Sequence, residues 1–293
     1  MRSLSYHKPK TVKEAIALLG RHGERAAILA GGTDLLVEWK KRLRAFSHII
    51  DLKGISSLKG IEFNPQGHLR IGPLTTMQAL ASSPALMNGL RVLSEAASRI
   101  GSWQIRNRAT IGGNVCHASP SGDTLPALLC LNAQLKLEGP QGGKIVPVED
   151  FFLGPGESIA VTEEILTEIL IPPLPRSSCG VYRKFALRRA MDLAVVGVAV
   201  LGSLDPIRDR IEDIRIGLGA VAPTPIRAKK AEDFLTGRKI DEDIIEETAT
   251  LASEEARPVS DIRGSEWYRR EMIKHIVAEA IQEVLEKIRQ GEE

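Results

Sequence analysis

The first hundred residues alternate between apolar and polar stretches that predict short helices and strands. Helical spacing predicts a helix over residues 11–20, capped by Thr11, supported by Glu14 as in a capping box, and ended by Gly20. The same pattern predicts strands over 26–30 and 47–52, a helix over 35–42, a hairpin of 60–63 and 68–72 about the turn 65–67, and helices over 76–82 and 89–100. The strand at 26–30 stops at Gly31-Gly32, so a turn should follow it.

The rest of the chain predicts a second domain. Before that domain come a helix over 124–130, a strand over 134–138 with a turn over 139–143, and a strand over 166–171. The prolines of 172–175 and the polar stretch behind them then predict a boundary. Beyond it we expect β segments at 181–186, 194–204 and 211–220, then helices at 241–256 and 265–290. The second domain is therefore predicted to be a small antiparallel sheet covered by helices.

Composition and charge narrow the class of protein. The 293 residues are 43% hydrophobic and 26% charged, which is ordinary for a globular protein of two domains. A net charge of +2 favours neither nucleic acid nor a membrane surface as a partner. Cys116, Cys130 and Cys179 have no metal-ligand spacing, so we expect reduced thiols and no metal site. No apolar run is long enough to span a bilayer and no leader is evident, so we expect a cytoplasmic protein.

The first glycine pair, Gly31-Gly32, has the pattern of an anion cradle. It lies between an apolar strand and a helix, where glycines let the backbone approach an oxyanion and take positive φ. Thr33 adds a hydroxyl donor, and Asp34 is a candidate cap for the helix that starts at Leu35. Neither a Rossmann nor a P-loop pattern is present, and the alternative is a plain strand–turn–helix connection.

The second glycine pair, Gly112-Gly113, is followed by a dense mixture of small polar and apolar residues. Asn114, His117 and Asp123 stand beside apolar neighbours, as in a pocket with a few convergent donors and acceptors. Asp123 could accept from ribose hydroxyls, and Asn114 could donate to a phosphate or a ring carbonyl. A single histidine without a patterned partner is more often a hydrogen-bonded pocket residue than a base or ligand, so no catalytic role is assigned to His117.

Together the segments AGGTDLL at 30–36 and TIGGNV at 110–115 resemble those of the FAD-binding, medium subunits of the molybdenum hydroxylases. That family includes xanthine dehydrogenases and carbon monoxide dehydrogenase. The resemblance covers nearly the whole chain and implies an α+β fold. A two-part FAD-binding domain of the vanillyl-alcohol-oxidase (PCMH) type would occupy 1–175, with subdomains of about 1–55 and 56–175. A C-terminal flavoprotein domain with a three-stranded antiparallel sheet would occupy 178–288.

The resemblance also implies the residues that contact FAD. Backbone amides of 29–36 would wrap the pyrophosphate, and Lys184 would lie near the isoalloxazine, where a positive charge stabilises anionic reduced flavin. The residues implied are Leu29, Ala30, Gly31, Gly32, Thr33, Asp34, Leu35, Leu36, Gly101, Ala109, Thr110, Gly113, Asn114, His117, Asp123 and Lys184. No residue is implied as an acid, base or nucleophile. Ile100 stands where xanthine dehydrogenases often carry an aromatic residue, which weakens any inference about stacking on the flavin.

The resemblance also implies partner subunits. Molybdopterin and [2Fe–2S] clusters would belong to a large and a small subunit, in a dimer of heterotrimers. The chain would relay electrons between those clusters and an external acceptor such as NAD, a quinone or ferredoxin. No cysteine-rich insertion for a [4Fe–4S] cluster is present. The alternatives are a stand-alone FAD-dependent oxidase of the vanillyl-alcohol-oxidase type and a non-enzymatic module in which the glycine turns are only structural.

Overall fold

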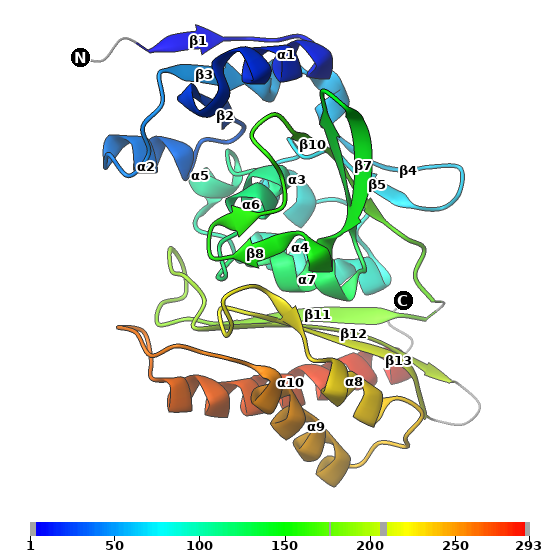
Figure 1. Ribbon diagram of the computed structural model, residues 1–293. Coiled ribbons are helices and arrows are strands. Elements are labelled where there is room, and N and C mark those ends of the chain that lie inside the picture. The colour runs from blue at the N-terminus through cyan, green and yellow to red at the C-terminus, as the bar shows by residue number, and fades with distance from the viewer. Residues whose placement is uncertain (1–3, 176, 206–209, 291–293) are drawn as a thin grey trace.

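A computed structural model describes residues 4–175, 177–205 and 210–290. Its elements stack in three tiers (Figure 1). A small sheet with two helices lies at the top, a five-stranded sheet with a group of short helices lies in the middle, and a second antiparallel sheet backed by long helices lies at the bottom. This mixture of helices and antiparallel strands confirms the predicted α+β class.

The top tier is a parallel sheet in the order β1-β3-β2. Its strands and helices are β1 (Ser5–His7), α1 (Val12–His22), β2 (Ala26–Leu29), α2 (Leu35–Lys40) and β3 (His48–Asp51). The Thr11 hydroxyl caps α1 by accepting from the N–H of Glu14, as predicted. The predicted end at Gly20 is wrong, because a glycine inside a helix costs only about 1 kcal/mol. The helix continues until Gly23, whose φ of 53° ends it.

The middle tier is antiparallel, in the order β4-β5-β10-β6-β7. Its strands are β4 (Ile61–Phe63), β5 (Leu69–Ile71), β6 (Gln134–Gly139), β7 (Gly142–Pro147) and β10 (Ile165–Ile171), with the pair β8 (Phe152–Gly154) and β9 (Glu157–Ser158) beside them. The predicted hairpin is confirmed, and the Asn64 side chain holds its turn by accepting from the N–H groups of Gln66 and His68. The sequence did not indicate β7, because this edge strand is largely exposed and has little apolar alternation.

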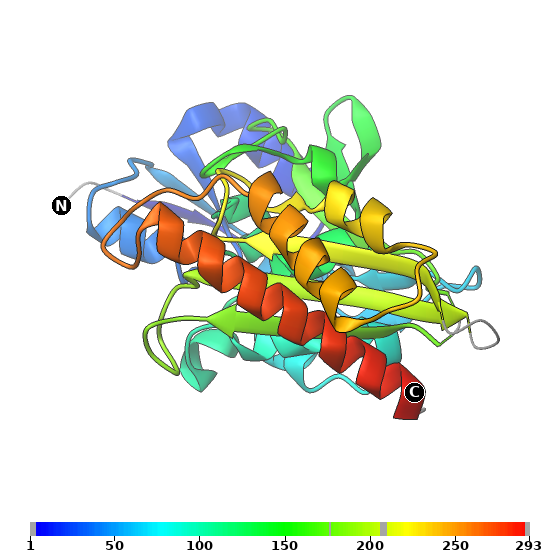
Figure 2. The same cartoon turned by 90° about the horizontal axis from the view of Figure 1, so that it is seen from below.

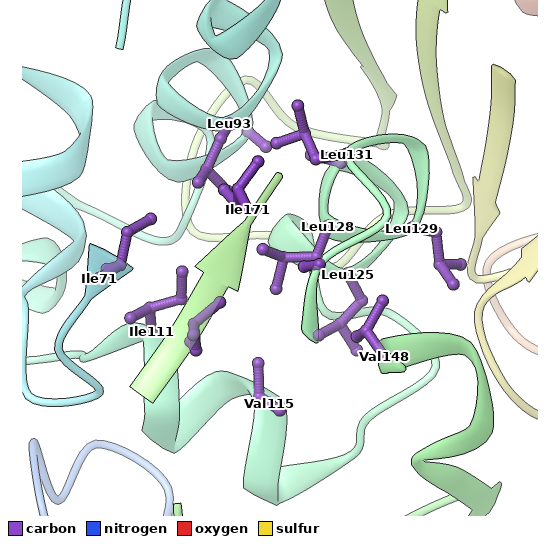
Figure 3. Packing of buried hydrophobic residues seen from close by; sticks show 14 of the residues in the cluster. Ile71, Leu93, Ile111, Val115, Leu125, Leu128, Leu129, Leu131, Val148 and Ile171 are labelled. Atoms are coloured by element: carbon purple, nitrogen blue, oxygen red, sulfur yellow. The ribbon is translucent and has the colours of Figure 1, made fainter. Parts of the chain in front are cut away.

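Short helices fill the connection between β5 and β6. They are α3 (Met77–Ala81), α4 (Arg91–Ser98), α5 (Trp103–Arg106), α6 (Ile111–His117) and α7 (Thr124–Cys130). Figure 3 shows Ile111 and Val115 of α6 on the side of α7 that carries Leu125 and Leu128, with Ile171 of β10 nearby. These side chains are fully or almost fully buried. The position of α6 is therefore set by a packed core and not by a surface turn.

The bottom tier is an antiparallel sheet in the order β11-β12-β13-β14. It comprises β11 (Cys179–Phe185), β12 (Val196–Asp205), β13 (Arg210–Gly219) and β14 (Ile226–Arg227), followed by α8 (Lys229–Leu235), α9 (Glu242–Glu255) and α10 (Glu266–Gln290). The three predicted strands are present, and the two-residue β14 adds a fourth to the predicted three-stranded sheet. Figure 2 shows α9 and α10 lying across one face of the sheet. The apolar stripe predicted for the last helix is buried there.

The other face of this sheet lies on the middle tier, against α4 and α7. Glycines on β13 permit the close approach. A Cβ at Gly217 would lie 2.4 Å from the carbonyl oxygen of Pro126, and one at Gly219 would lie 2.8 Å from a ring carbon of the same proline. Because both faces are covered, β12 is buried along nearly its whole length, which explains its continuous apolar run.

Two further expectations from the sequence concern membrane-spanning helices and the state of the cysteines. Within 4–175, 177–205 and 210–290, no helix is both long and apolar enough to cross a membrane. Cys116, Cys130 and Cys179 are free thiols.

Candidate cofactor-binding site

The loop after β2 leaves a row of backbone N–H groups without an acceptor. β2 ends at Leu29, and α2 begins at Leu35. Between them, the N–H groups of residues 31–35 donate to no protein acceptor in the part of the chain that the structure describes. The chain turns at Gly32, whose φ is 79°. Consecutive free N–H groups on one turn form a concave site for an anion.

The polar side chains of this loop lie at its outer edge. The Thr33 hydroxyl donates a long hydrogen bond, of 3.4 Å, to a carboxylate oxygen of Asp34. Asp34 stands at the capping position of α2, but its side chain accepts no helix N–H. The prediction that Asp34 caps the helix is therefore wrong. Its backbone is already helical, at φ −98° and ψ −52°, so the carboxylate does not reach back over the first turn.

The two glycine segments, about 80 residues apart in sequence, meet in space. A Cβ on Gly31 would lie 2.2 Å from the carbonyl oxygen of Arg108 and 3.0 Å from the Cα of Ala109. Only a glycine fits against this backbone. The chain that leads into α6 therefore forms a wall against which the first loop rests, and Ala109 lies beside the free N–H groups.

We expected the second glycine pair to form a turn. Instead, it lies in the first turn of helix α6. The Thr110 hydroxyl caps the helix by accepting from the N–H of Gly113 at 3.1 Å. The N–H groups of Ile111 and Gly112 donate to the carbonyls of Thr75 and Pro73. This helix end has no free donors to offer an anion, in contrast to the first loop. Gly112 instead permits close packing, because a Cβ there would lie 2.4 Å from the Cβ of Pro73.

Helix α6 presents two polar side chains further along. Asn114 accepts from the Thr124 hydroxyl through Oδ1 at 2.6 Å, while its amide nitrogen has no acceptor among the described residues. His117, in the last turn, lies with Nδ1 3.7 Å from a carboxylate oxygen of Glu38 on α2. Asn114 is thus fixed with its donor free, and His117 links the ends of two helices that flank the first loop.

A buried polar group joins the middle and bottom tiers. Asp123 accepts from the Tyr182 hydroxyl and from Lys184 Nζ, both at 2.8 Å. Lys184 Nζ also lies 3.3 Å from the carbonyl oxygen of Arg99. Asp123 is 7% exposed and the Lys184 side chain is 8% exposed, so their charges are compensated inside the protein.

Burial has a direct effect on the ionisation of this group. Burial raises the pKa of Asp123, and the Lys184 ammonium and Tyr182 hydroxyl offset part of that rise. Burial also raises the pKa of Tyr182 well above its ordinary value, and the nearby Asp123 carboxylate raises it further. Tyr182 is thus held as a neutral donor to the carboxylate.

The sequence did not single out Tyr182 as a partner of Asp123. A signal was available, because residues 182 and 184 alternate on one strand and so face the same side. Gly101, which we did expect, lies at this end of the site. Its φ is 46°, and its carbonyl oxygen accepts from the N–H of Met191 at 3.3 Å. The connection after β11 is thereby drawn close to residues 99–101.

The expected site residues therefore form two groups. The first consists of the loop from Leu29 to Leu36 and the backbone of Ala109 and Thr110. The second consists of Gly101, Asp123 and Lys184. Helix α6 runs between them, with Asn114 hydrogen-bonded to Thr124 beside Asp123.

Comparison with known proteins identifies the family. The domain family described as the FAD binding domain in molybdopterin dehydrogenase matches residues 2–174, and the CO dehydrogenase flavoprotein C-terminal domain family matches residues 181–284. The chain belongs to the FAD-binding, medium-subunit family of the molybdopterin dehydrogenases. It is thus an oxidoreductase subunit with FAD as its cofactor.

The similarity to individual members of this family extends over almost the whole length of both chains. The chain is 34% identical to the putative xanthine dehydrogenase FAD-binding subunit of Escherichia coli K12 over 282 residues, which are 96% of each chain. It is 35% identical to the carbon monoxide dehydrogenase medium chain of Hydrogenophaga pseudoflava, over 94% of this chain and 95% of that one. The solved carbon monoxide dehydrogenase from the same organism superimposes with a TM-score of 0.92, covering 96% of this chain and 97% of that chain.

The first loop meets the chemical demand of the family cofactor. FAD carries a pyrophosphate, and five free N–H groups at residues 31–35, with the Thr33 hydroxyl beside them, are donors suited to its oxygens. The close contact of Gly31 with Arg108 leaves no side chain in the way. The residues present therefore fit the cofactor that the family implies.

Proposed function

We propose that this chain is the electron-exit subunit of a molybdenum-containing dehydrogenase, in which electrons pass between [2Fe–2S] clusters of a partner chain and an external acceptor by way of FAD. The row of free N–H groups at 31–35 carries this proposal. When bound, FAD supplies one- and two-electron transfer chemistry. The share of this chain is then to hold the cofactor and set its surroundings, and no side chain acts as an acid, base or nucleophile.

The first loop binds the pyrophosphate in this proposal. The N–H groups of Gly31 to Leu35 donate to its oxygens, and Thr33 adds a hydroxyl. Leu29 and Ala30 precede the loop and Leu36 follows it, while Ala109 and Thr110 form the wall behind. Because the wall is backbone held by hydrogen bonds to residues 75–77, the loop has a rigid support.

The remaining residues contact the rest of the cofactor. The free amide of Asn114 donates to a carbonyl or phosphate oxygen, and Gly101 lets the backbone pass close to the ligand. Lys184 supplies a positive charge that Asp123 and the Arg99 carbonyl hold in one place. Both oxygens of Asp123 already accept from protein donors, so any contact with a sugar hydroxyl uses their remaining lone pairs. Gly113 and His117 line the surface of α6.

Partner subunits are supported by exposed apolar side chains on one side of the molecule. Of the seventeen large apolar side chains among the described residues that are at least 42% exposed, eleven occur on or near α2, at α5, between β11 and β12, and before and within the first turn of α10. These eleven are Leu36, Val37, Trp39, Leu43, Trp103, Leu187, Met191, Leu193, Val259, Ile262 and Trp267. Both overall views draw these segments toward the left edge (Figures 1 and 2). Ile262 is 96% exposed, which is unusual for a surface that faces only water.

The assembly and the domain division belong to the same proposal. The partners are a molybdopterin-binding large subunit and a [2Fe–2S] small subunit, in a cytoplasmic dimer of heterotrimers. The acceptor is NAD, a quinone or ferredoxin. The chain divides into a FAD-binding domain at 1–175 and a C-terminal domain at 178–288, which the family matches at 2–174 and 181–284 support. The relatives named above are subunits or chains of dehydrogenases, which favours this proposal over a stand-alone oxidase.

The test is the flavin content of two glycine variants. Gly31→Ala places a methyl group against the Arg108 carbonyl and displaces the first loop, whereas Gly143→Ala on the exposed strand β7 meets nothing closer than 3.5 Å. We expect the wild-type chain and Gly143→Ala to retain FAD, measured by flavin absorbance per mole of protein, and Gly31→Ala to lose most of it. A wild-type chain that stays colourless after incubation with FAD would overturn the proposal.

A further inference from the structure

Three of the six histidines lie together at the edge of the top tier, away from the candidate cofactor site. His7, His22 and His48 each offer one ring nitrogen, and these three nitrogens lie within 4.8 Å of one another. His7 Nε2 and His48 Nδ1 are 3.1 Å apart. In the described ranges, no other set of three or more histidine, cysteine or acidic side chains converges in this way. The FAD-binding proposal uses none of the three.

The fold brings the three together from separate elements. His7 pairs with Ile50 in the parallel sheet, two residues along from His48, so both histidines face the same side of it. Helix α1 lies on that side, and His22 is its last residue. The glycine loop follows the carboxyl end of β2, whereas His48 pairs with Ala26 at the amino end. His48 therefore lies at the opposite end of the sheet from the anion cradle, and β3 separates His7 on β1 from the cradle after β2.

The charges around the cluster select the kind of ligand. No carboxylate of the described chain pairs with these imidazoles, and Arg21 and Arg25 lie near His22. A hard cation such as Ca²⁺ or Mg²⁺ seeks oxygen ligands and negative charge, and it finds neither at this cluster. Imidazole nitrogens suit Zn²⁺, Cu²⁺ and Ni²⁺, which form directional bonds to neutral rings. Because one ring nitrogen of the His7–His48 contact must accept the hydrogen bond, at least one of the two rings is uncharged there.

We propose that His7, His22 and His48 form a three-histidine site for a divalent late transition-metal ion, Zn²⁺ above all, which ties β1, α1 and β3 together. Tetrahedral zinc with Zn–N bonds of about 2.0–2.1 Å needs nitrogens about 3.3 Å apart. The His7–His48 pair already has that spacing. The rings of His22 and His48 stack at 3.7 Å with an angle of 17°, so their lone pairs run side by side. The half-buried His22 ring must therefore turn to bring its nitrogen onto the ion.

The fourth position of the ion would be open to water. Three protein ligands leave one tetrahedral position for water, whereas closed structural sites have four protein ligands. The function that follows is stabilisation of the top tier, since an ion that binds the folded and not the unfolded chain raises the free energy of unfolding. The site is independent of the flavin, and so is its test.

The experiment titrates ZnSO4 into the full chain, purified without a histidine tag, by isothermal calorimetry. We expect one ion per chain for the wild type, and about tenfold or greater weakening for His22→Gln and for His7→Gln. The matched control is His275→Gln, on the exposed face of α10, which should bind as the wild type does. Equal binding by the wild type and the His7→Gln, His22→Gln double variant would overturn the proposal, as would no binding by the wild type.

Two further readouts separate metal binding from misfolding. Co²⁺ bound in a tetrahedral nitrogen site gives visible absorption bands, which should appear in the wild type, disappear on addition of Zn²⁺ and be absent from His22→Gln. Zn²⁺ should also raise the melting temperature of the wild type but not that of His22→Gln, while the flavin content of the two stays equal. A melting temperature that rises equally in both proteins would place the ion elsewhere and overturn the proposal.

Discussion

The two Gly-Gly pairs of this chain look alike in sequence but differ in their hydrogen bonding and packing. At Gly31-Gly32 the following N–H groups have no acceptor among the residues that the structure describes, and the loop rests on the backbone of Arg108. At Gly112-Gly113 the N–H groups are taken by Pro73 and by the capping hydroxyl of Thr110. We therefore propose that the first pair supplies an open anion cradle, whereas the second permits close packing. The dipeptide determines how near the backbone can come, while the neighbours determine whether its donors remain free.

The largest expected effect tests the open cradle. Gly31→Ala should weaken FAD binding about a hundredfold, because displacing the loop removes about two charge-assisted hydrogen bonds, or roughly 3 kcal/mol. Fluorescence titration with FAD measures this change, with Gly143→Ala as the control. If Gly31→Ala binds FAD as tightly as Gly143→Ala does, the first glycine pair does not bind the FAD pyrophosphate, and the proposed difference between the two pairs is wrong.

The second prediction concerns the packed pair. Gly112→Ala forces a methyl group against Pro73, so it should lower the free energy of unfolding by about 2 kcal/mol, as overpacking does. Urea denaturation followed by circular dichroism measures it. FAD affinity of the folded fraction should change little. A variant of wild-type stability that has lost FAD would show that Gly112, and not Gly31, supports the cofactor.

The third prediction tests the polar group beside the second segment. Tyr182→Phe removes one donor from the buried Asp123 carboxylate and should cost about 1.5 kcal/mol of stability. In the wild type, burial raises the pKa of Asp123 above its unfolded value, so the folded state holds the proton to higher pH. The stabilisation that protonated Asp123 contributes to the free energy of unfolding is then complete below the pKa of the unfolded chain. It decreases as pH rises through the pKa of the folded state.

The same variant sharpens that pH dependence. Tyr182→Phe removes a hydrogen-bond donor to the Asp123 carboxylate. The decrease in stability with pH should therefore extend to higher pH than in the wild type, as measured by denaturation across a pH series. Unchanged stability with weaker FAD binding would instead show that the group acts on the cofactor and not on the packing of the two tiers.

The smallest effect is expected at the helix cap. Thr110→Val keeps the shape but leaves the N–H of Gly113 without its acceptor, which should cost about 1 kcal/mol of stability. Thr110→Ser retains the hydroxyl and serves as the matched control. A Thr110→Val variant that binds an anion more tightly than the control does would reveal a second, masked cradle at α6. Equal stability of the two variants would argue against the cap.

The helices and strands with strong local hydrophobic patterns were predicted best from the sequence. Residues 124–130 form α7 as expected, and the apolar stripe of α10 is buried. The missed elements have weak patterns. Helix α6 contains two glycines, α8 is mostly charged and β14 has two residues. Each is held by tertiary contacts, as α6 is by its leucine-rich neighbour α7 (Figure 3), so local propensity had little to reveal.

Sequence alone determined the α+β class, most of the strands and helices, and the resemblance to FAD-binding medium subunits, because these depend on periodicity and on short motifs. Only the tertiary structure decided that Gly31 rests on Arg108, that Asp123 is paired with Tyr182 and Lys184, and that three scattered histidines meet. Each of these contacts joins residues at least 15 positions apart. Packing brings such residues together, and no local pattern records it.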